Sequence, residues 1–250
     1  MYLGSNKNKI NLKYFLIIFG FFLNISCTND NFNKPNNFFE KLNIIKIMPL
    51  GDSITQGIHI NSKNIGYRRD LYQILTDNGF RVDFVGSMND GSISDFDKDH
   101  EGHSGYRANQ IRDSIYNWLV INPADIILLH IGTNDINGGE APFSISLEIN
   151  SIFNQIDLYE KEYNKSIKVI AAKIINHQLY PGDIKKLNNY MSDIIKERRS
   201  RGDNIIIADM FSILNDENDF LDNVHPNESG YKKMAELWIE KIAEIWIENF

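Results

Sequence analysis

The chain has 250 residues, of which 42% are hydrophobic, 12% aromatic and 24% charged, a composition typical of a globular protein with a substantial core. Its formal net charge is −7, and no basic stretch is interleaved with aromatic residues, which argues against nucleic acid as a partner. The length suits one large α/β domain or two small domains.

The N-terminus differs in character from the rest of the chain. Three lysines among the first 13 residues precede a short apolar run, YFLIIFGFFLNI, which is followed by Ser26 and Cys27. This order is typical of a secretory signal peptide, which we expect over residues 1–26. The run is too short for a membrane-spanning helix, which needs ~20 apolar residues. Removal of three lysines and no acidic residue would change the net charge to −7 − 3 = −10.

Cys27 is the only cysteine, so it cannot form a disulfide within the chain. Its position resembles that of the lipid-acceptor cysteine of bacterial lipoproteins, although Asn24 stands where a leucine is usual and Leu23 comes one position early. We expect export to the outer surface or periplasm with a lipid anchor on Cys27; simple secretion and an uncleaved anchor are the alternatives. Residues 27–41 would form a polar tether, and residues 42–250 the folded domain.

From residue 41 onward, short apolar runs alternate with segments of helical periodicity, without a Pro/Gly-rich linker or an internal repeat. This alternation predicts right-handed crossovers and the α/β class: a three-layer α/β/α sandwich with a central five-stranded parallel sheet, flavodoxin-like. In chain order we expect a strand over 43–48, a helix over 66–79, a strand over 80–86, a helix over 108–121, a strand over 124–132, a helix over 144–163, a strand over 167–175, a helix over 183–201, a strand over 204–209 and a closing helix over 228–250.

Two of these segments carry a clear pattern of burial. The run ADIILLHIG (124–132) is continuously apolar, as in strands that are buried on both faces. The closing helix has apolar residues at spacings of three and four, which predicts that this face packs in the core. These residues are Met234, Leu237, Trp238, Ile242, Ile245 and Trp246.

Polar residues follow most of the expected strands. Ligands of open α/β sheets bind beyond the carboxyl ends of the strands, so these residues are the first candidates for chemistry. In strand order they are Gly51-Asp52-Ser53, DHEGHSGYR (99–107), Gly132-Thr133-Asn134-Asp135, NHQLYPG (176–182) and DNVHPNESG (222–230).

Ser53 is the candidate nucleophile for an acyl transfer. At a strand-to-helix turn its hydroxyl and its backbone N–H would both stand clear of the sheet. The structural alternative is an N-cap, because serine is a preferred helix cap. We expect Asp52 to brace the turn rather than to react.

His225 is the candidate general base among six histidines. It alone follows an aspartate, Asp222, by three residues in a turn closed by proline. Such a turn can bring the carboxylate onto Nδ1–H and leave Nε2 free to take a proton from Ser53. The alternative is a loop histidine with only local hydrogen bonds.

Three donors could stabilise the oxyanion of such a reaction: the Ser53 N–H, the Gly105 N–H and the side-chain amide of Asn134. Gly105 would let the backbone approach a substrate, and Asn134 is neutral and can donate. The alternatives are a turn glycine and an asparagine that bonds only within its own turn.

Other motifs give weaker evidence of a function. GDSITQG (51–57) lacks the Gly-Lys-Ser/Thr of a phosphate-binding loop and the Gly-x-Ser-x-Gly of α/β-hydrolases. The segment 97–103 groups metal-ligating residue types, but its spacing is not that of the zinc helix motif. We expect a solvated loop rim there and no metal. The residues concerned are Asp97, Asp99, His100, Glu101 and His103.

The sequence resembles the SGNH hydrolases, also called GDSL-type esterases, which are defined by four blocks carrying Ser, Gly, Asn and His. All four blocks occur here in family order, over roughly residues 44–240: GDSIT with Ser53, HSGYR with Gly105, GTND with Asn134, and DNVHP with Asp222 and His225.

Longer stretches, among them KIMPLGDSITQG, DHEGHSGYRANQI and NPADIILLHIGTND, look like the acetyl xylan esterase branch of that family. The resemblance implies a Ser53–His225–Asp222 mechanism, an oxyanion hole of Ser53, Gly105 and Asn134, no cofactor, and an acetylated polysaccharide as substrate. The departures are the lipoprotein-like leader and NHQLYPG, which matches no known subsite.

Three alternatives remain open within this family, and one lies beyond it. The same blocks serve GDSL-type lipases or lysophospholipases, thioesterases, and peptidoglycan O-acetylesterases, and the acyl length depends on a pocket beside Ser53 that the sequence does not show. A non-catalytic glycan-binding lipoprotein is disfavoured, because every catalytic residue type is retained.

Overall fold

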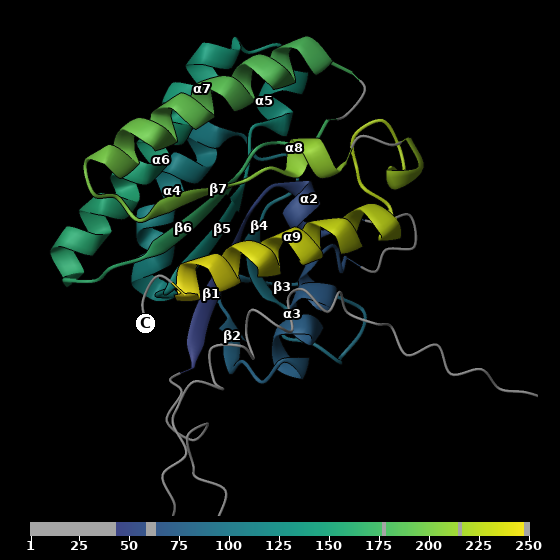
Figure 1. The fold of residues 1–250 in the computed structure, drawn as a ribbon, viewed down its shortest axis with the longest axis vertical. Helices are drawn as coiled ribbons and strands as arrows, with labels where there is room; N and C mark the ends of the chain where they lie inside the picture. The colour runs from purple at the N-terminus through teal and green to yellow at the C-terminus, as the bar shows by residue number, and fades with distance from the viewer. Residues whose placement is uncertain (1–43, 59–63, 177–178, 215–216, 248–250) are drawn as a thin grey trace, which may run out of the picture. The chain divides into compact units, whose positions relative to one another are not determined.

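A seven-stranded sheet organises the part of the chain that the structure, a computed structural model, describes (Figure 1). The expected signal peptide over 1–26, Cys27 and the tether over 27–41 lie outside this part. No helix among the described residues is both long enough and apolar enough to span a membrane. The described residues are 44–58, 64–176, 179–214 and 217–247.

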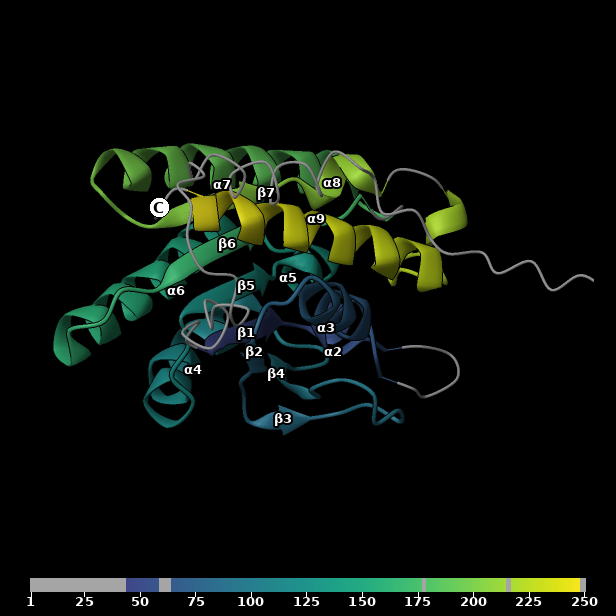
Figure 2. The ribbon, with the colours of Figure 1, turned by 60° about the horizontal axis from the view of Figure 1, so that its bottom comes forward.

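The strands run in the order β3-β4-β1-β5-β6-β7, and β2 lies beside the first half of β1 (Figure 2). All pairs are parallel except β3–β4. The five expected strands are present as β2-β1-β5-β6-β7, which is the flavodoxin-like order. The strands are β1 (Ile45–Gly51), β2 (Val82–Phe84), β3 (Met88–Asn89), β4 (Asp99–Gly102), β5 (Ile126–His130), β6 (Lys168–Ala172) and β7 (Ile205–Ala208).

The expected count of five strands is therefore wrong by two. β4 pairs with the carboxyl end of β1, and β3 pairs antiparallel with β4. The sequence of β4, DHEG, has no apolar side chain, so its burial in the sheet gives no hydrophobic signal.

The helices cover both faces of the sheet. α4, α6 and α7 pack on one face, and α3 and α9 pack on the other, where α9 crosses in front of the strands in Figure 1. The helices are α2 (Ser53–Gln56), α3 (Arg68–Asp77), α4 (Ala108–Ile121), α5 (Thr133–Asn137), α6 (Pro142–Tyr163), α7 (Pro181–Ser200), α8 (Met210–Ile213), the 3₁₀ turn η3 (Glu217–Asp219) and α9 (Glu228–Ile247).

Alternate residues of each central strand enter two separate cores. On β5, Ile127 and Leu129 face the helices α4 and α6, whereas Ile126 and Leu128 face α3 and α9. All five residues of β5 are buried, as the continuous apolar run predicted. The three-layer α/β/α architecture is confirmed.

The closing helix packs as its spacing predicted. Met234, Trp238, Ile242 and Ile245 of α9 are buried, and Leu237 is partly buried against the same core. Their burial fixes α9 across the sheet, and it thereby fixes the loop that precedes α9.

The register of the sheet brings three strand ends together. Gly51, the last residue of β1, lies opposite Gly102 of β4 on one side and His130 of β5 on the other. Ser53, Gly105 and Asn134 follow these three strand ends within two to four residues. The three segments therefore leave the sheet side by side.

Candidate active site

A short helix, α2, begins directly after β1 and carries Ser53 in its first turn. Asp52 is the N-cap of this helix, and its Oδ1 accepts a hydrogen bond of 2.9 Å from the Ile54 N–H. Ser53 is therefore the first helical residue and not the cap, so the capping alternative is wrong. The expected bracing role of Asp52 is confirmed, and the Ser53 N–H is one of those that a helix leaves without an intrahelical acceptor.

Gly51 allows this turn to pack against the neighbouring strand. A Cβ at position 51 would lie 2.2 Å from the carbonyl oxygen of His130 and 2.6 Å from Oγ1 of Thr55. Both distances are shorter than atoms tolerate, so only glycine fits here. The turn that carries Ser53 is thus held directly against β5.

A chain of two hydrogen bonds links Ser53, His225 and Asp222. The Ser53 Oγ lies 2.9 Å from Nε2 of His225, and Nδ1 of His225 lies 2.9 Å from Oδ2 of Asp222. Because an ionised carboxylate only accepts, Nδ1 carries the proton and Nε2 accepts from the serine hydroxyl. The structure brings the three residues together in the order of a proton relay, and their catalytic roles stay a prediction.

Backbone donors hold the carboxylate of Asp222. Its Oδ1 accepts from the N–H groups of Val224 and His225, both at 2.7 Å. Burial alone would raise the pKa of Asp222, but these bonds and the imidazole together hold it below the ordinary value. Asp222 is therefore ionised at neutral pH and can orient the imidazole.

The loop that carries His225 is tied to α9. The Leu221 N–H donates to the carbonyl of His225 at 2.8 Å, and the Asn227 N–H donates to that of Asp219 at 2.9 Å. The carboxylate of Asp219 is nearly buried and forms an ion pair of 2.7 Å with Lys233 of α9. The position of the candidate base therefore depends on the docking of α9.

Gly105 lies in an exposed turn after β4. Its φ of +78° is in the left-handed region, and a Cβ there would meet no atom within 4 Å. Glycine is favoured by this backbone conformation and not by lack of space. No acceptor among the described residues pairs with the Gly105 N–H, so this donor can serve a ligand.

Asn134 lies in α5, directly after β5, and its side chain reaches toward the same turn. Its Nδ2 donates to the carbonyl oxygen of Tyr106 at 3.0 Å, a contact across 28 positions in the sequence. The alternative of an asparagine that bonds within its own turn is therefore wrong. The second N–H of this amide has no partner among the described residues and can donate elsewhere.

The other histidines are placed differently. His100 and His130 are buried, and the ring of His103 is stacked on that of Tyr106, whereas His59 and His177 lie outside the described residues.

Comparison with known proteins shows the family of this chain. A family model described as GDSL-like Lipase/Acylhydrolase matches residues 47–238, which is most of the chain. The chain belongs to this family. The membership identifies the domain as a serine carboxylic ester hydrolase.

Relatives of this GDSL-family chain include carbohydrate esterases. A multidomain esterase of Ruminococcus flavefaciens is 32% identical over 224 residues, which cover 78% of this chain but only 28% of that longer protein. A family 3 carbohydrate esterase of Clostridium thermocellum is 33% identical, with a TM-score of 0.70 over 82% of this chain and 98% of that one. An acetyl esterase mutant solved with an acetate ion is 28% identical, with a TM-score of 0.72 over 83% and 100% of the two chains.

The segment 97–103 of this GDSL-family chain is not the solvated loop rim that its sequence indicated. Residues 99–102 form β4, where His100 and Glu101 are fully buried. Nδ1 of His100 accepts from the Gly102 N–H at 2.9 Å, and burial lowers the pKa of His100 to about 2. The described residues contain no group of three side chains arranged to hold a metal ion.

Arg68 is a buried residue of the site region that the sequence analysis missed. Its side chain is fully buried in α3 and donates to the last carbonyls of α2, those of Thr55 at 3.1 Å and Gln56 at 3.0 Å. Burial lowers its pKa to about 10, so it stays charged at neutral pH. Its spacing of three and seven residues from the buried Leu71 and Leu75 is the signal that could have revealed it. Three more carbonyls accept from it: Asn64, Asp90 and Lys98.

Two buried carboxyl groups lie beside the nucleophile turn. Burial, together with the nearby charge of Asp135, raises the pKa of Asp52 to about 7. Burial also raises the pKa of Asp135, to about 6, against the hydrogen bond that the Ala108 N–H donates to its two carboxylate oxygens. A neutral Asp52 would reduce the negative charge next to a developing oxyanion.

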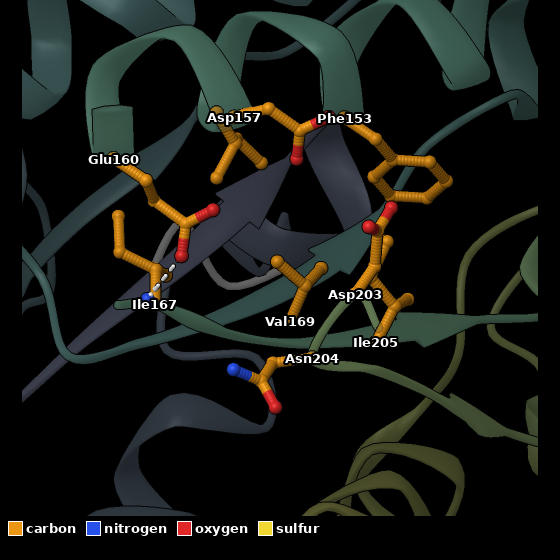
Figure 3. Close-up of a pocket in the computed structure, with 9 residues that line it drawn as sticks. Phe153, Asp157, Glu160, Ile167, Val169, Asp203, Asn204 and Ile205 are labelled. Atoms are coloured by element: carbon orange, nitrogen blue, oxygen red, sulfur yellow. Dashed lines mark hydrogen bonds between the residues drawn. The ribbon is translucent and has the colours of Figure 1, made fainter. Parts of the chain in front are cut away.

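A pocket elsewhere in the domain has no part in this site (Figure 3). It lies near the amino ends of β6 and β7, beside Val169 and Ile205, whereas the catalytic candidates follow the carboxyl ends of the strands. Its acids Asp157 and Asp203 are paired with Arg198. These ion pairs join α6, α7 and the start of β7, so we interpret the pocket as a structural feature.

Proposed function

We propose that this GDSL-family domain is a carbohydrate esterase that hydrolyses O-acetyl groups of a polysaccharide such as acetylated xylan. The Ser53–His225–Asp222 relay carries the proposal, because its two 2.9 Å contacts supply a nucleophile, a base and a group that orients the base. The choice of an acetylated glycan rests on the similarity to a family 3 carbohydrate esterase and to an acetyl esterase.

The first half of the proposed reaction acylates the enzyme. Nε2 of His225 takes the hydroxyl proton of Ser53 while Oγ attacks the acetyl carbonyl. The N–H groups of Ser53 and Gly105 and the amide of Asn134 donate to the oxyanion. Collapse of the tetrahedral intermediate breaks the ester bond, and His225 returns the proton to the departing sugar hydroxyl.

The second half restores the enzyme. Water gives a proton to His225 and attacks the acetyl-serine, which releases acetate and regenerates the hydroxyl of Ser53. Asp222 keeps Nδ1 protonated through both halves and stabilises the imidazolium. The proton transfers of both halves pass between Ser53 and His225, whose Oγ and Nε2 lie 2.9 Å apart.

Acetate release tests this proposal. Wild type, Ser53→Ala and the control Ser114→Ala, which changes a partly exposed serine of α4, would be compared on acetylated xylan and on p-nitrophenyl esters from acetyl to octanoyl. We expect release that requires Ser53, is unaffected at Ser114, and declines steeply beyond the acetyl ester.

Each other outcome points to a different conclusion. A preference for long acyl chains would indicate a lipase. Acetate release from acetylated peptidoglycan but not from xylan would indicate that peptidoglycan is the substrate. No release from any ester would contradict catalysis and favour a glycan-binding role.

A further inference from the structure

A buried carboxylate lies beneath the Gly105 turn. Glu101 of β4 has no exposed surface, and its carboxylate accepts from the Ser87 hydroxyl at 3.0 Å and from the Ser87 N–H. It also lies 2.7 Å from Nε2 of His103, whose side chain is 12% exposed. Because a carboxylate only accepts, Nε2 of His103 is the donor. A buried charge with three donors is fixed in place, and it fixes the histidine that it binds.

Two aromatic rings stack on the imidazole of His103. The ring of Tyr106 is stacked at 4.6 Å between centroids with an interplanar angle of 21°. The ring of Trp118, from α4, is stacked at 4.7 Å with an angle of 7°. Stacked rings at these distances are an attractive and directional contact. The imidazole is therefore held by a hydrogen bond to Glu101 and by two stacked aromatic rings.

The backbone around His103 connects the three parts of the expected oxyanion hole. The His103 N–H donates to the carbonyl of Gly51, next to the nucleophile turn, at 2.9 Å. The Tyr106 N–H donates to the carbonyl of His103 at 3.1 Å and closes the turn that contains Gly105. The carbonyl of Tyr106 then accepts from Nδ2 of Asn134 at 3.0 Å.

We propose that His103, held by Glu101 and by the rings of Tyr106 and Trp118, is a positioning residue of the oxyanion hole. It fixes the 103–106 turn, and through that turn it sets the direction of the Gly105 N–H and of the Asn134 amide. The proposal rests on the proposed esterase function, and it assigns His103 no contact with substrate.

A double-mutant cycle tests this coupling. His103→Gln keeps a donor for Glu101 but removes the stacking, and it would be combined with Asn134→Ala. Asn134→Ala alone should lower kcat by about 10²–10³-fold. If His103 acts through Asn134 and the Gly105 turn, the double variant should lose at least about fivefold less than the product of the single losses, in kcat and not in KM.

His100→Ala is the matched control, because it removes a buried imidazole of β4 whose contacts are the Gly102 N–H and the carboxylate of Asp90. No hydrogen bond or ring contact among the described residues joins His100 to the 103–106 turn. Its effect should multiply with that of Asn134→Ala. Multiplicative losses for His103→Gln as well, or a loss confined to KM, would overturn the proposal. If His103→Gln does not fold, Trp118→Leu removes one stacking ring from α4 and takes its place in the cycle.

A readout without turnover separates this proposal from the proposed function. The side-chain NH₂ resonances of Asn134, identified by their absence in Asn134→Ala, should shift and broaden in His103→Gln and stay in place in His100→Ala. Unchanged resonances in His103→Gln would contradict the positioning role even in an active esterase. A wild type without esterase activity, combined with shifted Asn134 resonances in His103→Gln, would contradict only the proposed function.

Discussion

At the scale of single residues, the candidate site depends on groups whose environment changes their chemistry. Ser53 has only 7% of its surface exposed, yet its hydroxyl faces an imidazole that a carboxylate orients. Asp52 next to it is fully buried, and one of its oxygens, Oδ2, has no hydrogen-bond partner among the described residues. Ser53 is therefore oriented toward the candidate base. The burial of Asp52 makes the stability of the folded domain depend on pH.

The raised pKa of Asp52 predicts a pH-dependent stability difference between wild type and Asp52→Asn. The pKa is about 7 in the folded domain and 3.8 in a model carboxyl, so between these values the folded state binds the extra proton. The contribution of Asp52 to stability is therefore full below pH 3.8 and is lost as the pH rises to about 7. Asp52→Asn should consequently gain Tm relative to wild type between pH 4 and pH 8.

Thermal unfolding at steps of one pH unit would measure this difference. Asp135 remains in both proteins, so its own titration largely cancels in the comparison, apart from the removed repulsion by Asp52. A Tm difference that stays constant from pH 4 to pH 8 would show that Asp52 titrates normally.

At the scale of elements, the two glycines of the site serve different needs, and this predicts different costs for alanine. Gly105→Ala meets no atom and should cost about 1 kcal/mol for its left-handed backbone. Gly51→Ala would place a Cβ 2.2 Å from the carbonyl of His130, so β1 or β5 must move, at a cost of about 3 kcal/mol or more. Urea unfolding midpoints of the two variants would measure the contrast, and equal midpoints would contradict it.

Most elements could be predicted because their burial is apolar. The run that forms β5 and the stripe of α9 follow the simple periods of a buried strand and a packed helix. Ser53 and Asn134 could be placed because they directly follow predicted parallel strands, which end at one edge of the sheet. Functional residues concentrate in the loops after strands, so polar residues in these loops indicate the candidate site.

β4 could not be predicted and Arg68 was missed, and both bury charged or titratable groups. The partners of these groups lie between 2 and 30 positions away in the sequence, with no regular spacing. Glu101 depends on Ser87 and His103, and Arg68 depends on backbone carbonyls of four loops and helix ends. A backbone carbonyl leaves no residue-specific signal in a sequence, so only the fold reveals such partners.

At the scale of the whole molecule, we propose that the domain is exported and anchored by a lipid on Cys27. The evidence is the basic, then apolar, then small-residue order of the first 27 residues. Full-length chain expressed in a bacterium with an alkyne-bearing fatty acid should become labelled, whereas Cys27→Ser should not.

Fractionation completes that experiment. The labelled protein should sediment with membranes and the Cys27→Ser variant should not, while both keep esterase activity because Cys27 lies outside the catalytic candidates. An unlabelled wild-type chain released into the medium would support simple secretion, and an unlabelled chain that stays in membranes would support an uncleaved anchor.

The proton relay also has a consequence for the time at which this chain becomes active. Ser53 and His225 are 172 positions apart, and the loop of His225 is held by the ion pair between Asp219 and α9. A ribosome therefore makes the candidate nucleophile long before the candidate base exists. The proposed relay can form only after α9 has docked, so the growing chain should lack esterase activity until its last helix is in place.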